Sequence, residues 1–204
     1  MTVFNALLLL GPTGAGKSPF GDHMEEVGVG SGRCCHFDFG EHLRGAAADP
    51  NAYPSLGAEA LAVIRNVLDT GALLENHQFE IVETLFGEFA ERRGMNASDW
   101  VLLNGMPRHV GQAEGVKRFA EVKIVVSLAC EEALVYQRIA TNAGGDRTHR
   151  EDDQREAVKN KLRIFNERTM PLVAHYRGAG ARVIEVPVGL DTRPREIAAA
   201  LPAL

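Results

Sequence analysis

Residues 11–18, GPTGAGKS, constrain this chain more than any other stretch, because they follow the apolar run Leu7–Leu10 and precede a segment that can form a helix. A strand, a glycine-rich turn and a helix in that order are the context that the pattern G-x-x-x-x-G-K-[ST] requires. The glycines let backbone N–H groups point inward at the start of a helix, where they can surround a phosphate. The pattern predicts a loop that binds the phosphates of a nucleoside triphosphate.

The groups of this loop have separate expected roles. Lys17 would reach the β- and γ-phosphates, and the Ser18 hydroxyl would bind Mg²⁺. The backbone that cradles the phosphates would come from Gly11, Gly14, Ala15 and Gly16. A glycine-rich turn without a ligand is the alternative, and about one chain in a hundred of this length would contain the pattern by chance. ATP and Mg²⁺ are the expected cofactors.

Composition narrows the class of protein. A chain of 204 residues, 45% of them hydrophobic, fits a single domain with a full core and room for a small lid. The net charge of −5 argues against a partner such as a nucleic acid polymer or a membrane surface. The N-terminal residues show neither a basic n-region nor a membrane span, and the three cysteines form no disulfide or metal-binding pattern. We expect a cytoplasmic monomer that acts on small molecules.

Hydrophobic patterning predicts strands and helices in alternation. The expected strands are residues 5–10, 34–37, 100–103, 122–128 and 182–186. The expected helices are residues 17–27, 41–47, 58–68, 76–93, 110–119, 131–140, 154–176 with an interruption near Pro171, and 194–201. This order predicts a three-layer α/β P-loop NTPase fold, with a mainly five-stranded parallel sheet covered by helices on both faces.

Two further motifs carry a resemblance to a known family. Together with the loop, Gly105-Met-Pro-Arg108 and Arg150-x-Asp152-Asp153 resemble the adenylate kinase family of nucleoside monophosphate kinases, and the likeness covers nearly the whole chain. The resemblance implies transfer of the γ-phosphate of ATP to a nucleoside monophosphate. It also implies one domain, residues 1–204, with an acceptor-binding insertion at about 38–75 and a short lid at about 141–153.

The same resemblance implies residues on the acceptor side. Residues 38–44, DFGEHLR, are similar to the family's S-T-G-D-x-L-R, whose arginine, Arg44 here, holds the acceptor phosphate. Residues 103–108, LNGMPR, resemble the D-G-F/Y-P-R signature, so that Arg108 would bind the acceptor phosphate and Gln112 its base. The implied acceptor-binding residues are Phe39, Arg44, Leu73, Leu74, Gly105, Arg108, Gln112, Arg147 and Lys161.

On the donor side, Arg138 matches the family's arginine that packs on the donor adenine, and Gly189 lies where the backbone approaches the donor base. Arg147 and Arg150 would fold over the transferring group as the lid closes. Arginine suits these positions because its planar guanidinium binds two phosphate oxygens at once. The implied catalytic residues are Lys17, Arg108, Arg138 and Arg150.

The chain departs from the family at several of these positions. Asn104 replaces the aspartate that organises the water shell of Mg²⁺, and Phe39 replaces a threonine that can donate a hydrogen bond to the acceptor base. Lys161 and Asn142 stand where the family has arginines. We hypothesise that Asp38, on the neighbouring strand, supplies the carboxylate that Asn104 lacks. In this hypothesis Ser18 binds the metal directly and Asn104 acts through a water molecule.

The alternative for Asp38 is that it only caps the helix that follows it. Two alternatives also stay open for the function. Asp38 after the second strand favours a P-loop kinase of a non-nucleotide metabolite, of the shikimate or gluconate kinase type, whereas Asn104 favours a nucleotide-binding protein without turnover. The seven histidines are interpreted as structural or solvent-facing, because in-line phosphoryl transfer needs no general base.

Overall fold

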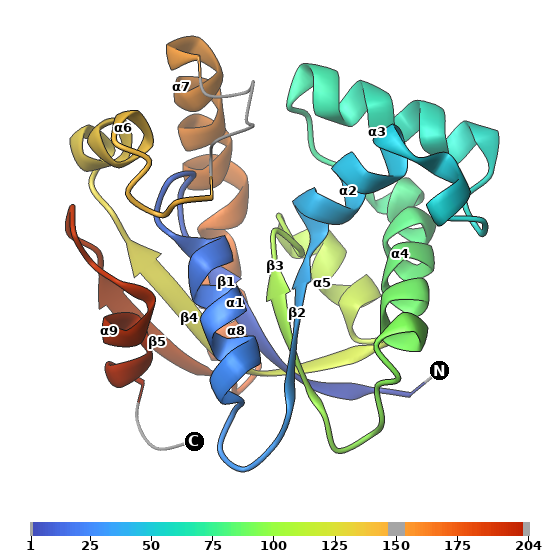
Figure 1. The fold of residues 1–204 in the computed structure, drawn as a ribbon, viewed down its shortest axis with the longest axis horizontal. Helices are drawn as coiled ribbons and strands as arrows, with labels where there is room; N and C mark the ends of the chain where they lie inside the picture. The colour runs from blue at the N-terminus through green and yellow to red at the C-terminus, as the bar shows by residue number, and fades with distance from the viewer. Residues whose placement is uncertain (1, 147–153, 202–204) are drawn as a thin grey trace.

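A parallel sheet forms the centre of the computed structural model, which describes residues 2–146 and 154–201. Its five strands lie in the order β2-β3-β1-β4-β5 (Figure 1). They are β1 (Phe4–Leu10), β2 (Cys34–Asp38), β3 (Trp100–Asn104), β4 (Ala120–Ala129) and β5 (Arg182–Pro187). All four neighbouring pairs are parallel, so the carboxyl ends of the strands share one edge of the sheet.

Each pair of successive strands is connected by one helix or by three. The helices are α1 (Lys17–Val27), α2 (Phe39–Ala48), α3 (Ala58–Thr70), α4 (Phe79–Arg92), α5 (Val110–Val116), α6 (Glu132–Ala140), α7 (Arg155–Ile164), α8 (Pro171–Gly178) and α9 (Pro194–Ala199). Short 3₁₀ turns at Pro50–Ala52 and Asn76–Gln78 precede α3 and α4. Among the described residues, no helix is both long and apolar enough to cross a membrane.

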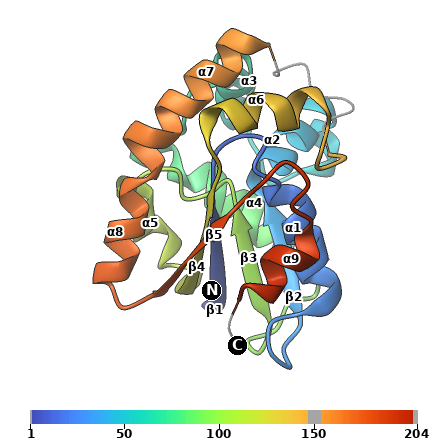
Figure 2. The same cartoon turned by 90° about the vertical axis from the view of Figure 1, so that its left-hand side faces the viewer.

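Hydrophobic cores on both faces of the sheet make the fold three-layered. Successive side chains of a strand point to opposite faces, and β1 follows this rule. Leu7 and Leu9 pack with Phe20 of α1 and Ile197 of α9. The second core contains the alternate β1 residues and side chains from α4, α5 and α8, namely Phe4, Ala6, Leu8, Leu10, Phe86, Val116 and Leu172. Figure 2 shows the two helical layers on either side of the sheet. The predicted fold class is confirmed.

The long helix expected at residues 154–176, with an interruption near Pro171, has this interruption in the structure. It is interrupted before Pro171 by a π-helical turn, Phe165–Thr169, in which the Met170 N–H donates to the Phe165 carbonyl at 2.9 Å. Proline has no N–H to continue an α-helical ladder, and the wider turn ends where Pro171 begins α8. The turn places Thr169 beside the loop that follows β3, where its hydroxyl donates to the Arg108 carbonyl at 2.8 Å.

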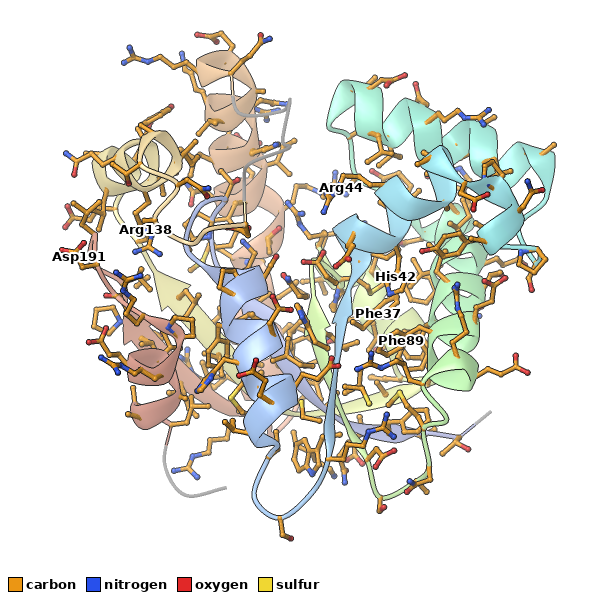
Figure 3. All side chains as sticks on the ribbon, viewed as in Figure 1. Phe37, His42, Arg44, Phe89, Arg138 and Asp191 are labelled. Carbon is orange, nitrogen blue, oxygen red and sulfur yellow. The ribbon has the colours of Figure 1, made fainter. Side chains whose placement is uncertain are left out.

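Helices α2 and α3 stand beyond the carboxyl ends of β2 and β3, across from α6 and α7 (Figure 1). An aromatic cluster anchors α2: His42 stacks on Phe37 of β2 at 4.8 Å and meets Phe89 of α4 at 5.4 Å (Figure 3). Burial, together with the nearby charge of Arg92, lowers the pKa of His42 to about 4. His42 is therefore neutral at physiological pH and packs as an aromatic side chain.

Candidate active site

A cavity of about 220 Å³ opens at the carboxyl ends of β1, β2 and β3. On one side it is lined by the phosphate-binding loop, residues 11–18, and on the other by α2, residues 71–74 and the loop after β3. Lys161 of α7 and Phe165 of the π-helical turn complete the lining. Ligands of open parallel α/β sheets bind at this edge, so the cavity lies where the sequence predicts it.

The phosphate-binding loop has a backbone that requires glycine at two positions. Gly14 and Gly16 have φ angles of 76° and 91°, in the left-handed region that favours glycine. A β-carbon at Gly14 would also lie 2.8 Å from the Ile139 side chain of α6. Lys17 holds the loop closed, because its Nζ donates to the carbonyl oxygens of Gly11 at 2.8 Å and Pro12 at 2.7 Å. The loop leads directly into α1, whose N-terminus favours an anion.

Arg138 is buried between this loop and the segment after β5. Its Nε donates to the Gly14 carbonyl at 2.9 Å, and its Nη1 donates to the carbonyls of Gly189 at 2.5 Å and Leu190 at 2.7 Å. Figure 3 shows the side chain beneath α6, near Asp191. The structure thus brings together Arg138 and Gly189, the two residues that the sequence assigns to the donor base.

Asp38 lies at the end of β2 and uses its two carboxylate oxygens differently. Oδ2 accepts hydrogen bonds from Ser18 Oγ at 2.6 Å and from Asn104 Nδ2 at 2.8 Å. Oδ1 accepts one from the Glu41 N–H at 3.0 Å and caps α2. The sheet register pairs Asp38 directly with Asn104. The two roles that the sequence left as alternatives are therefore compatible in one side chain.

The charge of Asp38 is maintained by its neighbours. Burial by itself raises the pKa of this carboxyl. Its neighbours outweigh burial and hold the pKa below its usual value. These neighbours are the Ser18 hydroxyl, which donates a hydrogen bond, then the charge of His36, the Glu41 amide and the charge of Arg44. An ionised carboxylate therefore stands beside the Ser18 hydroxyl at neutral pH. Hydroxyl and carboxylate oxygens are the hard ligands that suit Mg²⁺ and its bound water.

His36 is the neighbour of this cluster that the sequence interpretation assigned no role at the site. It is 8% exposed, its Nδ1 lies 2.9 Å from Asp22 Oδ1, and its Nε2 lies 3.3 Å from Asn104 Nδ2. Gly21 of α1 makes room for the ring, since a β-carbon there would collide with it. The signal in the sequence is the spacing: His36 precedes Asp38 by two residues on a strand, which puts both side chains on one face.

Two arginines face the cavity from the acceptor side. Arg44 extends from α2 toward the middle of the molecule (Figure 3), and Arg108 follows β3. Within residues 2–146 and 154–201, neither guanidinium makes a hydrogen bond or an ion pair. Burial lowers the pKa of Arg108, although an arginine stays charged at neutral pH. The structure therefore holds two guanidinium groups that form no ion pair with a described residue, next to a loop built for phosphate, although the Arg44 charge also acts on the Asp38 carboxylate.

The backbone around Arg108 is fixed by Gln112. Gln112 Oε1 accepts from the Arg108 N–H at 2.7 Å, and its Nε2 donates to the Leu74 carbonyl at 2.8 Å. His109 Nε2 lies 3.2 Å from the same Leu74 oxygen. Gly105 precedes this loop with a φ of 81°, and Phe39 packs buried against Phe37 with 6.2 Å between the ring centroids. All of the predicted acceptor-side residues that the structure describes line this cavity.

Comparison with known proteins agrees with this geometry. The sequence profile described as adenylate kinase matches residues 9–181. The chain belongs to the adenylate kinase family. An adenylate kinase of Parvibaculum lavamentivorans is 31% identical over 185 residues, which cover 85% of this chain and 80% of the relative. An adenylate kinase of Stenotrophomonas maltophilia is 31% identical over 204 residues, covering 97% of this chain and 99% of the relative.

Among solved structures, a gluconokinase from Sinorhizobium meliloti superposes with a TM-score of 0.51 at 15% sequence identity, covering 98% of this chain and 93% of that chain. At that identity the likeness shows a shared fold. Membership of the adenylate kinase family supports a phosphotransferase of the nucleotide kinase type.

Part of the predicted lid lies outside the described residues. Arg147, Arg150, Asp152 and Asp153 fall in the stretch 147–153, so their predicted roles stay predictions. Asp146, just before this stretch, and Lys161 of α7, eight residues after it, both line the cavity.

Proposed function

We propose that this protein transfers the γ-phosphate of ATP to the phosphate of a nucleoside monophosphate held across the same cavity. The observation that carries the proposal is the pair of guanidinium groups of Arg44 and Arg108, which form no ion pair with a described residue and face a phosphate-binding loop within one cavity. Two groups of positive charge in one cavity, the loop with Lys17 and the two arginines, suit two phosphorylated substrates.

The proposed mechanism depends on positioning and positive charge. The amides of the loop and Lys17 hold the β- and γ-phosphates, while Arg44 and Arg108 hold the acceptor phosphate in line with the γ-phosphate. In-line transfer needs little covalent assistance once both groups are fixed and their charge is neutralised. Arg138 and Gly189 form the donor-base side, and Arg147 and Arg150 of the lid cover the transferring group.

Mg²⁺ fits the residues present at the end of β2. The Ser18 hydroxyl would bind the metal, and the carboxylate of Asp38, with the amide of Asn104, would hold its water shell. When bound, the metal neutralises charge on the phosphates of ATP. Asp38 supports this assignment because it is ionised and hydrogen-bonded to Ser18. We therefore propose that this chain carries on β2 the carboxylate that its relatives carry on β3.

The test is a panel of acceptors. The purified protein is incubated with ATP and Mg²⁺ together with each of four nucleoside monophosphates, or with small hydroxy acids such as gluconate and shikimate, and products are identified by mass. We expect ADP and a nucleoside diphosphate to form in equal amounts. Transfer to a hydroxy acid, or ATP binding without transfer to any acceptor, would contradict the proposal. A Lys17→Ala variant measures the background hydrolysis.

A further inference from the structure

The π-helical turn Phe165–Thr169 joins α7 to α8 on one face of the sheet (Figure 2). Three side chains spaced by four residues line the cavity from this stretch. They are Lys161 of α7, Phe165 at the start of the turn and Thr169 at its end. π-Helical turns are rare, and they occur often at functional sites. This one lies at the border of the proposed active site.

The wider turn keeps these three side chains on one side of the helix. In an α-helix, with about 3.6 residues per turn, residues four apart are offset by about 40°, so two such steps would separate Lys161 from Thr169 by about 80°. The π turn is closed by the Met170 N–H and the Phe165 carbonyl at 2.9 Å. Because it takes more residues per turn, four residues there fall short of a full turn, and the offset of the first step is reversed. The same helix thus reaches the cavity at Lys161 and the loop after β3 at Thr169.

Thr169 fixes the backbone of an arginine that faces the cavity. Its hydroxyl donates to the Arg108 carbonyl at 2.8 Å, while Gln112 Oε1 accepts from the Arg108 N–H at 2.7 Å. Thr169 and Gln112 are both 2% exposed. Two buried side chains, one from the π-helical turn and one from α5, therefore hold both polar groups of the Arg108 backbone. A backbone fixed in this way reduces the freedom that the guanidinium must lose when it binds a phosphate.

The preceding residue of the turn contacts a second part of the acceptor side. Arg168 Nη2 lies 3.3 Å from Glu75 Oε1, and Glu75 directly follows the cavity-lining residues 71–74. Both side chains are about half exposed to solvent, and exposed ion pairs contribute little. We therefore expect the buried hydrogen bond of Thr169 to have a larger effect than the ion pair of Arg168.

We propose that Thr169 is a positioning residue for the acceptor phosphate, because it holds the Arg108 backbone, and that the extra residue of the π-helical turn brings it there. The inference rests on the proposed function and adds to it a residue outside the acceptor-binding set that the family resemblance implies. It applies to every nucleoside monophosphate that the protein accepts, since all of them carry the phosphate that Arg108 would bind.

The first test separates the hydroxyl of Thr169 from its shape. Thr169→Val removes the hydroxyl, and Thr169→Ser keeps it. AMP, GMP, CMP and UMP are assayed at saturating ATP and Mg²⁺. We expect Thr169→Val to raise the KM of each accepted monophosphate about tenfold, with an unchanged KM for ATP, and Thr169→Ser to restore most of the loss. Thr141→Val is the matched control, because the Thr141 hydroxyl donates to the Gln137 carbonyl of its own helix at 2.9 Å and the residue does not line the cavity.

Three results of this test would overturn the inference. A lower melting temperature of Thr169→Val with unchanged KM values would indicate a purely structural role. An equal rise in the KM for ATP would mean that the residue does not act on the acceptor. A loss in Thr169→Ser as large as in Thr169→Val would mean that the hydroxyl is not responsible. Transfer by the wild type to none of the four monophosphates would contradict the proposed function itself, and the inference with it.

A double-mutant cycle tests whether Thr169 acts through Arg108. In Arg108→Ala the backbone carbonyl that Thr169 bonds remains, but the guanidinium is gone. We expect Thr169→Val to raise the KM of the acceptor by less than about twofold in the Arg108→Ala background, compared with about tenfold in the wild type. An equal factor in both backgrounds would mean that the two residues act independently, which overturns the inference.

The last test removes the extra residue of the turn. Asn166 is exposed, so its deletion shortens the stretch at the surface, and Asn166→Ala is the matched control that keeps the length. We expect the deletion to raise the KM of the acceptor at least as much as Thr169→Val does, because Phe165 and Thr169 can no longer both face the cavity. Asn166→Ala should match the wild type. Thermal unfolding monitors whether the deletion variant folds. A folded deletion variant with the KM of the wild type would contradict the role of the extra residue, and if the variant does not fold, the Thr169 variants decide.

Discussion

The polar side chains in the two halves of the cavity differ in their hydrogen-bond partners. At the phosphate end, the side chains of Ser18, Asp38 and Asn104 meet one another at the rim of the cavity, where a metal and its water can reach them. On the acceptor side of the cavity, the side chains of Gln112 and Thr169 bond backbone groups of Arg108 and Leu74. The phosphate end thus joins polar side chains to one another, whereas the acceptor side uses polar side chains to fix the backbone that carries Arg108 and Leu74.

The origin of this difference lies in the fold. The phosphate end is built on the central strands, whose register sets Asp38 beside Asn104 and follows from backbone pairing. The apolar lining on the acceptor side comes from α2, α3 and residues 71–74, which stand outside the sheet (Figure 1). Their positions depend on side-chain links such as Gln112 to Leu74 and Arg168 to Glu75, at 3.3 Å.

The largest effect is expected at the phosphate end, from Lys17→Ala. The ammonium stabilises charge on the transferring group more in the transition state than in the ground state. We expect kcat to fall about a hundredfold, on the order of 3 kcal/mol of barrier, with a small change in melting temperature. Steady-state kinetics with all four monophosphates measure it. If Lys17→Ala kept most of its activity, the result would contradict the role of the phosphate end in holding the transferring group.

On the acceptor side, the next largest effect is a pH dependence of the free energy of unfolding, and its source is His42. Its pKa is lowered from 6.5 to about 4 by burial and by the charge of Arg92. Between these two pH values the imidazole is protonated in the unfolded chain and neutral in the folded chain. Stability is therefore lost as the pH falls from about 6.5 to about 4, by about 2–3 kcal/mol. Urea unfolding at a series of pH values measures the loss. His42→Phe should remove this part of the pH dependence, and an identical profile in the variant would contradict the assignment.

A smaller effect separates acceptor binding from donor binding. Arg44→Ala or Arg108→Ala should raise the KM for the acceptor or lower kcat by roughly thirtyfold, about 2 kcal/mol for a lost charge-assisted hydrogen bond. ATP affinity in calorimetry should hardly change. Arg138→Ala should mainly weaken ATP binding, because Arg138 links the phosphate-binding loop to Gly189. Equal losses of ATP affinity in both kinds of variant would contradict the division of the cavity into two halves.

The fold, and the strand ends at which the site lies, could be predicted from the sequence. Continuous apolar runs identified β1 and β3, because buried parallel strands carry little else. The strands β2, β4 and β5 were located although His36, Lys123 and Glu185 interrupt their apolar residues. The glycine pattern of residues 11–18 located the loop, since Gly14 and Gly16 adopt backbone angles that other residues rarely take. The position of Asp38 at the carboxyl end of β2 followed from the same reasoning.

Other features could not be predicted, because they depend on contacts between distant residues. Gln112 and Leu74 are 38 residues apart, and no local pattern shows that the amide of one bonds the carbonyl of the other. The π-helical turn before Pro171 depends on how α7 and α8 pack, and the proline alone indicated only an interruption. Whether Asp38 caps α2 or supplies a carboxylate to a metal was open; the structure shows the cap on one oxygen and a hydrogen bond from Ser18 on the other.

The central claim is that the Asp38 carboxylate serves the metal that Ser18 binds. Asp38→Asn removes the charge but keeps a side chain that caps helices well. Asp49→Asn is the matched control, because Asp49 also caps a helical turn, at Pro50–Ala52, and does not line the cavity.

The deciding measurement is a Mg²⁺ titration of activity, with Mg²⁺-dependent binding of ATP followed in parallel by calorimetry. In Asp38→Asn we expect the Mg²⁺ concentration for half-maximal activity to rise about tenfold, and Asn104→Asp added to that variant should restore it. Asp49→Asn should match the wild type. An unchanged Mg²⁺ titration in Asp38→Asn, with only a lower melting temperature, would leave Asp38 as a helix cap and contradict the claim.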